Sequence, residues 1–273
     1  MFGIQNYNKE VFNHDFIRNT SFKAQYNFNK ACSAQRDKFV ALLKSDFPVV
    51  SDDISQEIEF KMVPSSCEQS ISVNNNMENH QVVMRSNDGQ KEYILRNDLL
   101  QYSEIGKIYK TSNDFNDAIL KSSHFFREID VNEFKSIELR KINIIDFSST
   151  NKNPDIQMSS YAPIKEMLSP HLLCMYDALY SCNSHIKQNI YDLQLEDGDY
   201  TLSIKYGYLV LNKEENMKNI TGQIIIDLRI EKKSSTQIEN LKTELEKCHR
   251  ELYNAFRWCV SNRMLDIMRM SNE

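Results

Sequence analysis

The chain has 273 residues, a formal net charge of −5 at pH 7, 41% hydrophobic residues and 26% charged residues. These values are typical of a folded protein with a sizeable core, and with only 6 glycines and 5 prolines they exclude collagen-like, disordered and linker-rich chains. The acidic balance and the lack of a cluster of Lys and Arg argue against nucleic acid as a partner.

The start of the chain does not resemble an export signal. The sequence Met-Phe-Gly-Ile-Gln-Asn-Tyr-Asn-Lys-Glu has no basic stretch followed by an apolar one, and no apolar run downstream is long enough to span a bilayer. Its 6 cysteines, spread thinly through such a chain, are typical of reduced thiols rather than a disulfide framework. We therefore expect a cytoplasmic protein that does not cross a membrane.

The first elements predicted are a strand, a helix and a second strand. Apolar and polar side chains alternate over 22–28, which is the period of a half-buried strand. Residues 39–47 have the spacing of a short amphipathic helix, which Pro48 ends because the residue before proline avoids helical geometry. Alternation over 58–62 predicts a second strand. The Ser- and Asn-rich stretch 64–80 predicts a loop or a strand extension.

A hairpin and a helix follow. Residues 82–86 and 91–95 read as two strands, and Asn87-Asp88-Gly89 between them predicts a tight turn, because glycine supplies the positive φ that such turns need. Apolar side chains recur on one stripe over 114–128, which predicts a helix.

The second part of the chain repeats this order. A strand over 137–147 precedes a helix over 163–182, and hairpin arms over 190–195 and 200–204 precede a strand over 223–230. A final helix closes the chain. The pattern therefore predicts that a strand-helix-three-strand-helix unit occurs twice.

These elements predict an α+β fold of two similar halves with largely antiparallel sheets. The halves are residues 1–130 and 131–273, either as separate units or as one continuous domain. Thr236 and Glu239 form a capping-box pattern, and apolar residues spaced by three and four follow it. This predicts a helix over 236–269 of about 50 Å, which either crosses a wide sheet or mediates self-association.

The strand over 137–147 has an unusual apolar pattern. Ile137 and Leu139 would face one way and Ile142 and Ile144 the other, so the apolar phase switches near Lys141. A β-bulge produces such a switch, and so does a central strand that is covered on both faces. We expect a central strand.

Two groups of His and Cys residues are candidates for a metal site or a catalytic pair. The first is an H-x2-C-x7-C-x2-H pattern formed by His171, Cys174, Cys182 and His185. On one continuous helix the two histidines would be about 21 Å apart, which is too far for one metal ion, so we interpret the four residues as a buried stripe. The neighbours Cys248 and His249 would point about 100° apart on a helix and could not pair without other partners.

Residues 137–145, Ile-Glu-Leu-Arg-Lys-Ile-Asn-Ile-Ile, resemble the Arg-Ile-Gly-Leu-Arg-Tyr-Ile-Asn-x-Ile signature of a sporadically distributed, uncharacterised bacterial protein family. Arg140 and Asn143 stand at the matching positions. The likeness extends in outline over nearly the whole chain, through Phe22 to Phe28, Phe47-Pro48, Ser86, Asp88-Gly89, Tyr109, Phe115, Asp227, His249 and Phe256. Three positions depart from the signature: Ser136 replaces its first Arg, Glu138 its Gly and Lys141 its Tyr.

The resemblance implies candidate ligand-binding residues: Arg140, Asn143, Asp227 and His249. Arg140 and Asn143 have a structural alternative, because polar groups within a sheet commonly bond to loop carbonyls. The scattered occurrence of the family implies an accessory function in bacteria, such as defence against phage.

The common catalytic motifs do not occur in the sequence, including the P-loop, the dinucleotide turn, the nucleophile elbow and the zinc-protease helix. We therefore expect a non-enzymatic interaction or ligand-sensing module with no catalytic residue, metal or cofactor, and with a protein partner or self-association through 236–269. The alternative is a Mg²⁺-dependent nuclease or phosphodiesterase. Acids and cations at Asp130, Glu138, Arg140 and Lys141, and again over 227–232, loosely resemble restriction-type nuclease sites.

Overall fold

The computed structural model describes residues 1–10, 12, 16–27, 29, 31–54, 57–62, 69–74, 80–148, 155–157, 167–172, 188–210 and 221–269. The first half contains β1 (Ile17–Gln25), α1 (Ala31–Ala34), α2 (Arg36–Leu43), β2 (Val49–Ile54), β3 (Glu57–Met62), β4 (Gln69–Asn74), β5 (His80–Arg85), β6 (Lys91–Leu95), β7 (Leu99–Ile105) and α3 (Ser112–Glu128). The second half contains β8 (Glu133–Phe134), β9 (Ser136–Ser148), β10 (Ile156–Gln157), the 3-10 turn η1 (Pro170–Leu172), β11 (Gln188–Asp197), β12 (Tyr200–Val210), β13 (Thr221–Lys232), β14 (Thr236–Gln237), the 3-10 turn η2 (Ile238–Asn240), α6 (Leu241–Cys259) and α7 (Asn262–Arg269).

One large sheet runs through both halves. Its described strands lie in the order β11-β12-β13-β9-β1-β7-β6-β5-β2, and every neighbouring pair in this order is antiparallel. β10 adds a short parallel pair to β9, while β3 and β4 form a separate hairpin. The α+β class, with its large antiparallel sheet and long C-terminal helix, is confirmed.

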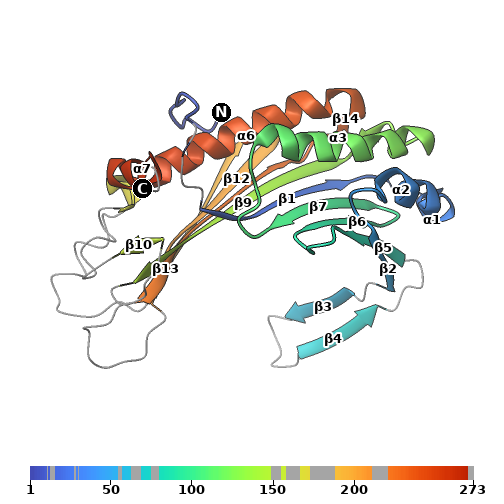
Figure 1. Ribbon diagram of the computed structural model, residues 1–273, viewed down its shortest axis with the longest axis horizontal. Helices are drawn as coiled ribbons and strands as arrows, with labels where there is room; N and C mark the ends of the chain where they lie inside the picture. Colours follow the sequence, from blue (N-terminus) through green and yellow to red (C-terminus); the bar gives the residue numbers. More distant parts are fainter. Residues whose placement is uncertain are drawn as a thin grey trace.

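The two halves pair symmetrically about the centre of this sheet. β1 and β9, the first long strand of each half, are antiparallel neighbours. Moving outward, one side reads β1-β7-β6-β5 and the other β9-β13-β12-β11. α3 follows β7, α6 follows β13, and both helices lie on the same face of the sheet (Figure 1). Each half therefore repeats one arrangement, related to the other by an approximate twofold axis between β1 and β9.

The predicted strands need two corrections in the first half. β2 and β7 were not predicted, and they belong to the main sheet, whereas the predicted strand over 58–62 is β3, which lies outside it. The predicted hairpin is present as β5 and β6, with Gly89 at a φ of 68° in the turn. Most of the helix predicted over 163–182 lies outside the described residues. Of this range the structure describes only residues 167–172, which include η1.

The core lies between the sheet and the helices. Phe115, Ile119 and Phe126 of α3 are fully buried, as are Leu245 and Leu252 of α6. Each such side chain contributes about 1.5–3 kcal/mol through burial. α6 packs on β13 and β9 and beside α3. Its apolar stripe is thus covered within the chain, as expected for a helix that crosses a wide sheet, and self-association through 236–269 stays a prediction.

The C-terminal helix is shorter than predicted. Thr236 lies in β14 instead of capping a helix, and α6 begins only at Leu241. α6 ends at Cys259 because Val260 has an extended backbone and forms a β-bridge with Leu168. α7 then begins at Asn262. None of the helices in the described part of the chain has the length and apolar character needed to span a membrane.

β9 is a central strand between β13 and β1, as expected, and Ile137 and Leu139 face the helices while Ile142 and Ile144 face the opposite side without a bulge in β9. The register between β9 and β13 is unbroken from Ile137 to Ser148, and the irregularity lies in β1, between Ile17 and Asn19. The odd-numbered residues of β9 face the helices throughout, and four of them are buried apolar residues: Ile137, Leu139, Ile145 and Phe147. Lys141 and Asn143 occupy the two helix-facing positions between them. They interrupt the apolar pattern because they border a cavity.

Candidate functional site

A cavity of about 620 Å³ opens on the helical side of the sheet. Its floor is formed by β9 and β13, and one wall by α6. The segment 109–111 and the first turn of α3 form a second wall. Residues 1–10, here called the N-terminal strap, run past its rim and contribute Tyr7, Lys9 and Glu10 to its lining.

The floor of the cavity is polar. Asn143 is buried, and its side-chain amide donates a hydrogen bond of 3.2 Å to the carbonyl of Ile226 on the neighbouring strand. Lys141 donates from Nζ to the hydroxyl of Tyr109 at 2.8 Å. These two contacts hold the Asn143 and Lys141 side chains in place, since each is tied to a different element.

His249 lies in the α6 wall and is only 6% exposed. Its Nε2 lies 2.9 Å from Oδ1 of Asn116, and its ring packs edge-on against Phe115. Burial lowers the pKa of His249 well below 6.5, and the positive charges of Lys141 and Lys9 lower it further. The imidazole is therefore neutral at pH 7. Its Nδ1 is buried and has no hydrogen-bond partner among the described residues.

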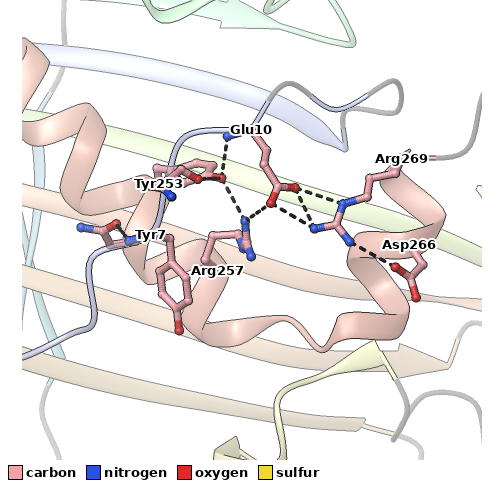
Figure 2. Close-up of polar contacts among 8 residues, drawn as sticks. Tyr7, Glu10, Tyr253, Arg257, Asp266 and Arg269 are labelled. Atoms are coloured by element: carbon pink, nitrogen blue, oxygen red, sulfur yellow. Dashed lines mark hydrogen bonds and ion pairs between the residues drawn. The ribbon is translucent and has the colours of Figure 1, made fainter.

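The N-terminal strap is tied to the C-terminal helices by a cluster of polar contacts (Figure 2). The Glu10 carboxylate accepts hydrogen bonds from Arg269, at 2.8 to 3.0 Å, and from Arg257, at 3.2 Å. These bonds, led by that from Arg269, lower the pKa of Glu10. The hydroxyl of Tyr253 accepts from the Glu10 N–H and donates to the carbonyl of Asn8. The rim of the cavity is thus closed by contacts that are mostly exposed and electrostatic.

The structure divides the four predicted ligand-binding residues into two pairs. Asn143 and His249 both line the cavity. Arg140 and Asp227 lie on the opposite face of the sheet, because alternate residues of a strand point to opposite sides. There Arg140 donates two hydrogen bonds to Asp227, at 2.8 and 2.6 Å, and these raise the pKa of the guanidinium. The second pair is therefore a cross-strand ion pair remote from the cavity.

The acids and cations considered for a nuclease do not form one site. Glu138 points to the same open face as Arg140 and lies 3.6 Å from Arg229, while Lys141 faces the cavity on the other side. Asp130 follows the end of α3 with a φ of 58°. Across the described residues, no group of three or more His, Cys, Asp or Glu side chains could hold a metal ion.

The cysteine and histidine patterns give no reactive pair in the described residues. Burial raises the pKa of the Cys248 thiol to about 12, so it stays protonated as part of the core beneath α6. Of the H-x2-C-x7-C-x2-H pattern, Cys174, Cys182 and His185 lie outside the described residues, as does the side chain of His171.

Several residues that line the cavity were not among the ligand-binding residues predicted from the sequence: Lys9, Tyr109, Ser112, Lys141 and Tyr253. The sequence does contain a signal for Lys141, because this charged residue interrupts the apolar alternation of β9 at a position where a core residue is expected. The strap residues had none, since their spacing follows neither a strand nor a helix.

Comparison with known proteins does not extend this picture. A scan against models of protein families finds no match for this chain. A search of the curated proteins finds no similar sequence either. The resemblance of residues 137–145 to a bacterial family signature therefore stays a prediction.

Proposed function

We propose that this protein is a non-enzymatic ligand-sensing module, which binds a small molecule in the cavity between β9, α6 and the N-terminal strap. The observation that carries the proposal is the cavity itself. Its volume of about 620 Å³ is that of a small-molecule site, and it combines apolar walls with a few fixed polar groups. The buried Nδ1 of His249 has no hydrogen-bond partner among the described residues, and a ligand would supply one.

The strap gives such a site a means of signalling. It crosses the cavity rim and is held by polar contacts to α6 and α7, of which those from Arg269 are exposed and those from Tyr253 and Arg257 are part-buried (Figure 2). Exposed contacts such as those between Arg269 and Glu10 are weak individually, so the end of the strap around Glu10 can open at low cost. A ligand that touches both the strap and α6 would favour the closed arrangement over the open one. Binding in the cavity would thereby change the exposed surface near both chain ends.

The family resemblance supports a setting for this function. The signature-like run over residues 137–145 is similar to that of a sporadically distributed bacterial family. Scattered occurrence is typical of accessory systems, including defence against phage. On that basis we propose that the module works in the bacterial cytoplasm, where a protein partner binds differently to the open and closed arrangements of the strap.

The experiment that tests the site is a fragment-library screen by ligand-observed NMR with two matched variants. Asn113→Trp places a large side chain on the cavity rim at the start of α3. Asn132→Trp makes the same change at an exposed position beyond the other end of that helix. We expect fragments that bind the wild type and the Asn132→Trp variant but not the Asn113→Trp variant. Equal binding to all three proteins, or no binding to any, would refute a ligand site in this cavity.

A further inference from the structure

We infer that the ligand is a small organic oxyanion, a phosphate or a carboxylate, whose charged group sits between Lys141, Lys9 and the N-terminus of α3. The inference rests on the proposed function and adds the chemical class of the ligand. Three features of the cavity support it: an excess of positive charge, an exposed helix N-terminus, and a buried acceptor that has no partner in the part of the chain that the structure describes.

The charges that line the cavity do not balance. The lining contains four basic side chains, Lys9, Lys110, Lys141 and Arg250, and two carboxylates, Glu10 and Glu246. The Glu10 carboxylate is already engaged by Arg257 and Arg269, which are not among the lining residues. No ion pair with a described residue is formed by Lys9, Lys110 or Arg250. The cavity therefore carries net positive charge, in a protein whose overall charge is −5.

Helix α3 adds to this potential, because its N-terminus opens on the cavity. Thr111 caps the helix and accepts from the N–H of Asp114. The preceding N–H groups, of Ser112 and Asn113, have no acceptor within the helix, as at any helix start, and both residues line the cavity. Lys9 donates to the hydroxyl of Ser112 at 3.1 Å, which places its ammonium group at this end of the helix. Helix N–H groups beside a lysine are a favourable setting for an oxyanion.

His249 defines a second contact. Its Nε2 lies against a carbonyl-type oxygen, Oδ1 of Asn116, so Nε2 carries the proton and Nδ1 is an acceptor. The His249 side chain is only 6% exposed, and its Nδ1 has no partner among the described residues. A ligand bound here is therefore expected to place a hydrogen-bond donor next to Nδ1. A hydroxyl or N–H group of a ligand supplies one. Tyr109, Leu252 and Phe256 add apolar wall surface, which suits an organic body rather than a bare inorganic ion.

The test compares three probes that share an aromatic ring and a hydroxyl but differ in one group. These are 4-hydroxyphenyl phosphate, 4-hydroxybenzoate and the neutral 4-hydroxybenzyl alcohol, each titrated into the full chain by isothermal calorimetry. We expect at least one anion to bind roughly tenfold or more tightly than the alcohol, and its affinity to fall as salt is added. Whichever anion binds more tightly identifies phosphate or carboxylate as the preferred group.

Substitutions of single lysines identify which positive charges contribute to anion binding. Lys141→Met should weaken binding of the preferred anion by roughly tenfold or more and leave the alcohol unchanged. Lys9→Met, on the exposed strap, should act in the same direction without any risk to the core. Lys205→Met is the control, because it removes the same charge on the open face of β12, where Lys205 pairs with Asp192. It should change neither affinity.

The outcomes separate this inference from the proposed function. If the alcohol binds as tightly as both anions, or if Lys141→Met and Lys9→Met leave anion affinity unchanged, the oxyanion assignment is wrong while the ligand site stands. If none of the three probes binds but fragments still bind in a manner blocked by Asn113→Trp, the oxyanion assignment again fails alone. If neither probes nor fragments bind, both proposals fail.

Discussion

Neighbouring side chains on β9 have different tasks because a strand presents alternate residues to opposite faces. Arg140 points to the open face and pairs with Asp227 across the strand, while Lys141 points to the cavity and bonds to Tyr109. Two residues further on, Asn143 is bound to the carbonyl of Ile226. One short run of sequence thus contributes both to the framework of the sheet and to the candidate site.

The pair formed by Arg140 and Asp227 is predicted to stabilise the sheet and to have no part in ligand binding. Both hydrogen bonds are well formed, but the Arg140 side chain is 42% exposed, so a double-mutant cycle of Arg140→Ala and Asp227→Ala should give a coupling energy of about 1 kcal/mol. The more exposed pair of Lys205 and Asp192 should give about 0.5 kcal/mol or less. A loss of ligand affinity in either single variant of the first pair would place the site on the open face instead.

His249 is predicted to make stability depend on pH. The pKa of His249 in the folded protein lies well below 6.5, whereas the unfolded chain has the ordinary value of about 6.5. Below that pH the unfolded chain takes up a proton that the folded protein does not, so the free energy of unfolding falls as the pH decreases. The stability is fully present above pH 6.5 and is lost progressively towards the folded-state pKa.

Urea unfolding of the wild type and of His249→Gln measures this effect. Between pH 6.5 and one unit lower, the wild type should lose about 1 kcal/mol more than the variant. His124→Gln, which removes an exposed histidine from α3, should keep the wild-type profile. Parallel profiles for the wild type and His249→Gln would mean that His249 is not buried in its neutral form.

At the scale of elements, the N-terminal strap is held to the C-terminal helices partly by exposed contacts. Glu10 anchors the end of the strap through Arg257 and Arg269 (Figure 2). Glu10→Gln should therefore speed amide hydrogen exchange over residues 1–10 with little effect on the sheet. Because the pKa of Glu10 lies below its ordinary value of 4.5, the same loosening in the wild type should appear only as the pH falls through that lowered pKa.

Asp266→Asn is the matched control for the strap. Asp266 accepts from Arg269 on α7 but does not contact the strap through any described contact. Its substitution should leave exchange over residues 1–10 unchanged. Exchange that is equally fast in the wild type and in Glu10→Gln would show that the carboxylate does not hold the strap.

Local patterns predicted most elements and missed those that depend on distant partners. The strand β7 was not predicted, because the charged residue Glu104 occupies a helix-facing position where the pattern of a strand requires an apolar residue. Within the core the hydroxyl of Tyr102 donates a hydrogen bond to Glu104. The end of α6 was not predicted because Val260 fits the apolar stripe, whereas its extended backbone depends on pairing with the distant segment around Leu168. For the site, Asn143 and His249 were predicted, while the strap was not. Its position is fixed by side-chain contacts to residues more than 200 positions away.

At the scale of the molecule, the pairing of β1 with β9 makes one sheet from two halves. Separating the halves would leave a long unpaired strand at each new edge. We therefore predict one cooperative unfolding transition for residues 1–273. The single tryptophan, Trp258 on α6, reports on the second half by fluorescence, and far-UV circular dichroism reports on both. The two urea curves should coincide, and midpoints that differ would indicate two independent domains.

The central claim is that the cavity between β9, α6 and the strap binds a ligand that holds the strap closed. Hydrogen–deuterium exchange of the full chain, with and without saturating 4-hydroxyphenyl phosphate, tests it most directly. Slower exchange is predicted over residues 1–10, at the start of α3 and in the middle of α6, with no change in β11 and β12. Slower exchange in the sheet strands alone, or unchanged exchange in the strap when the probe is bound, would contradict the account.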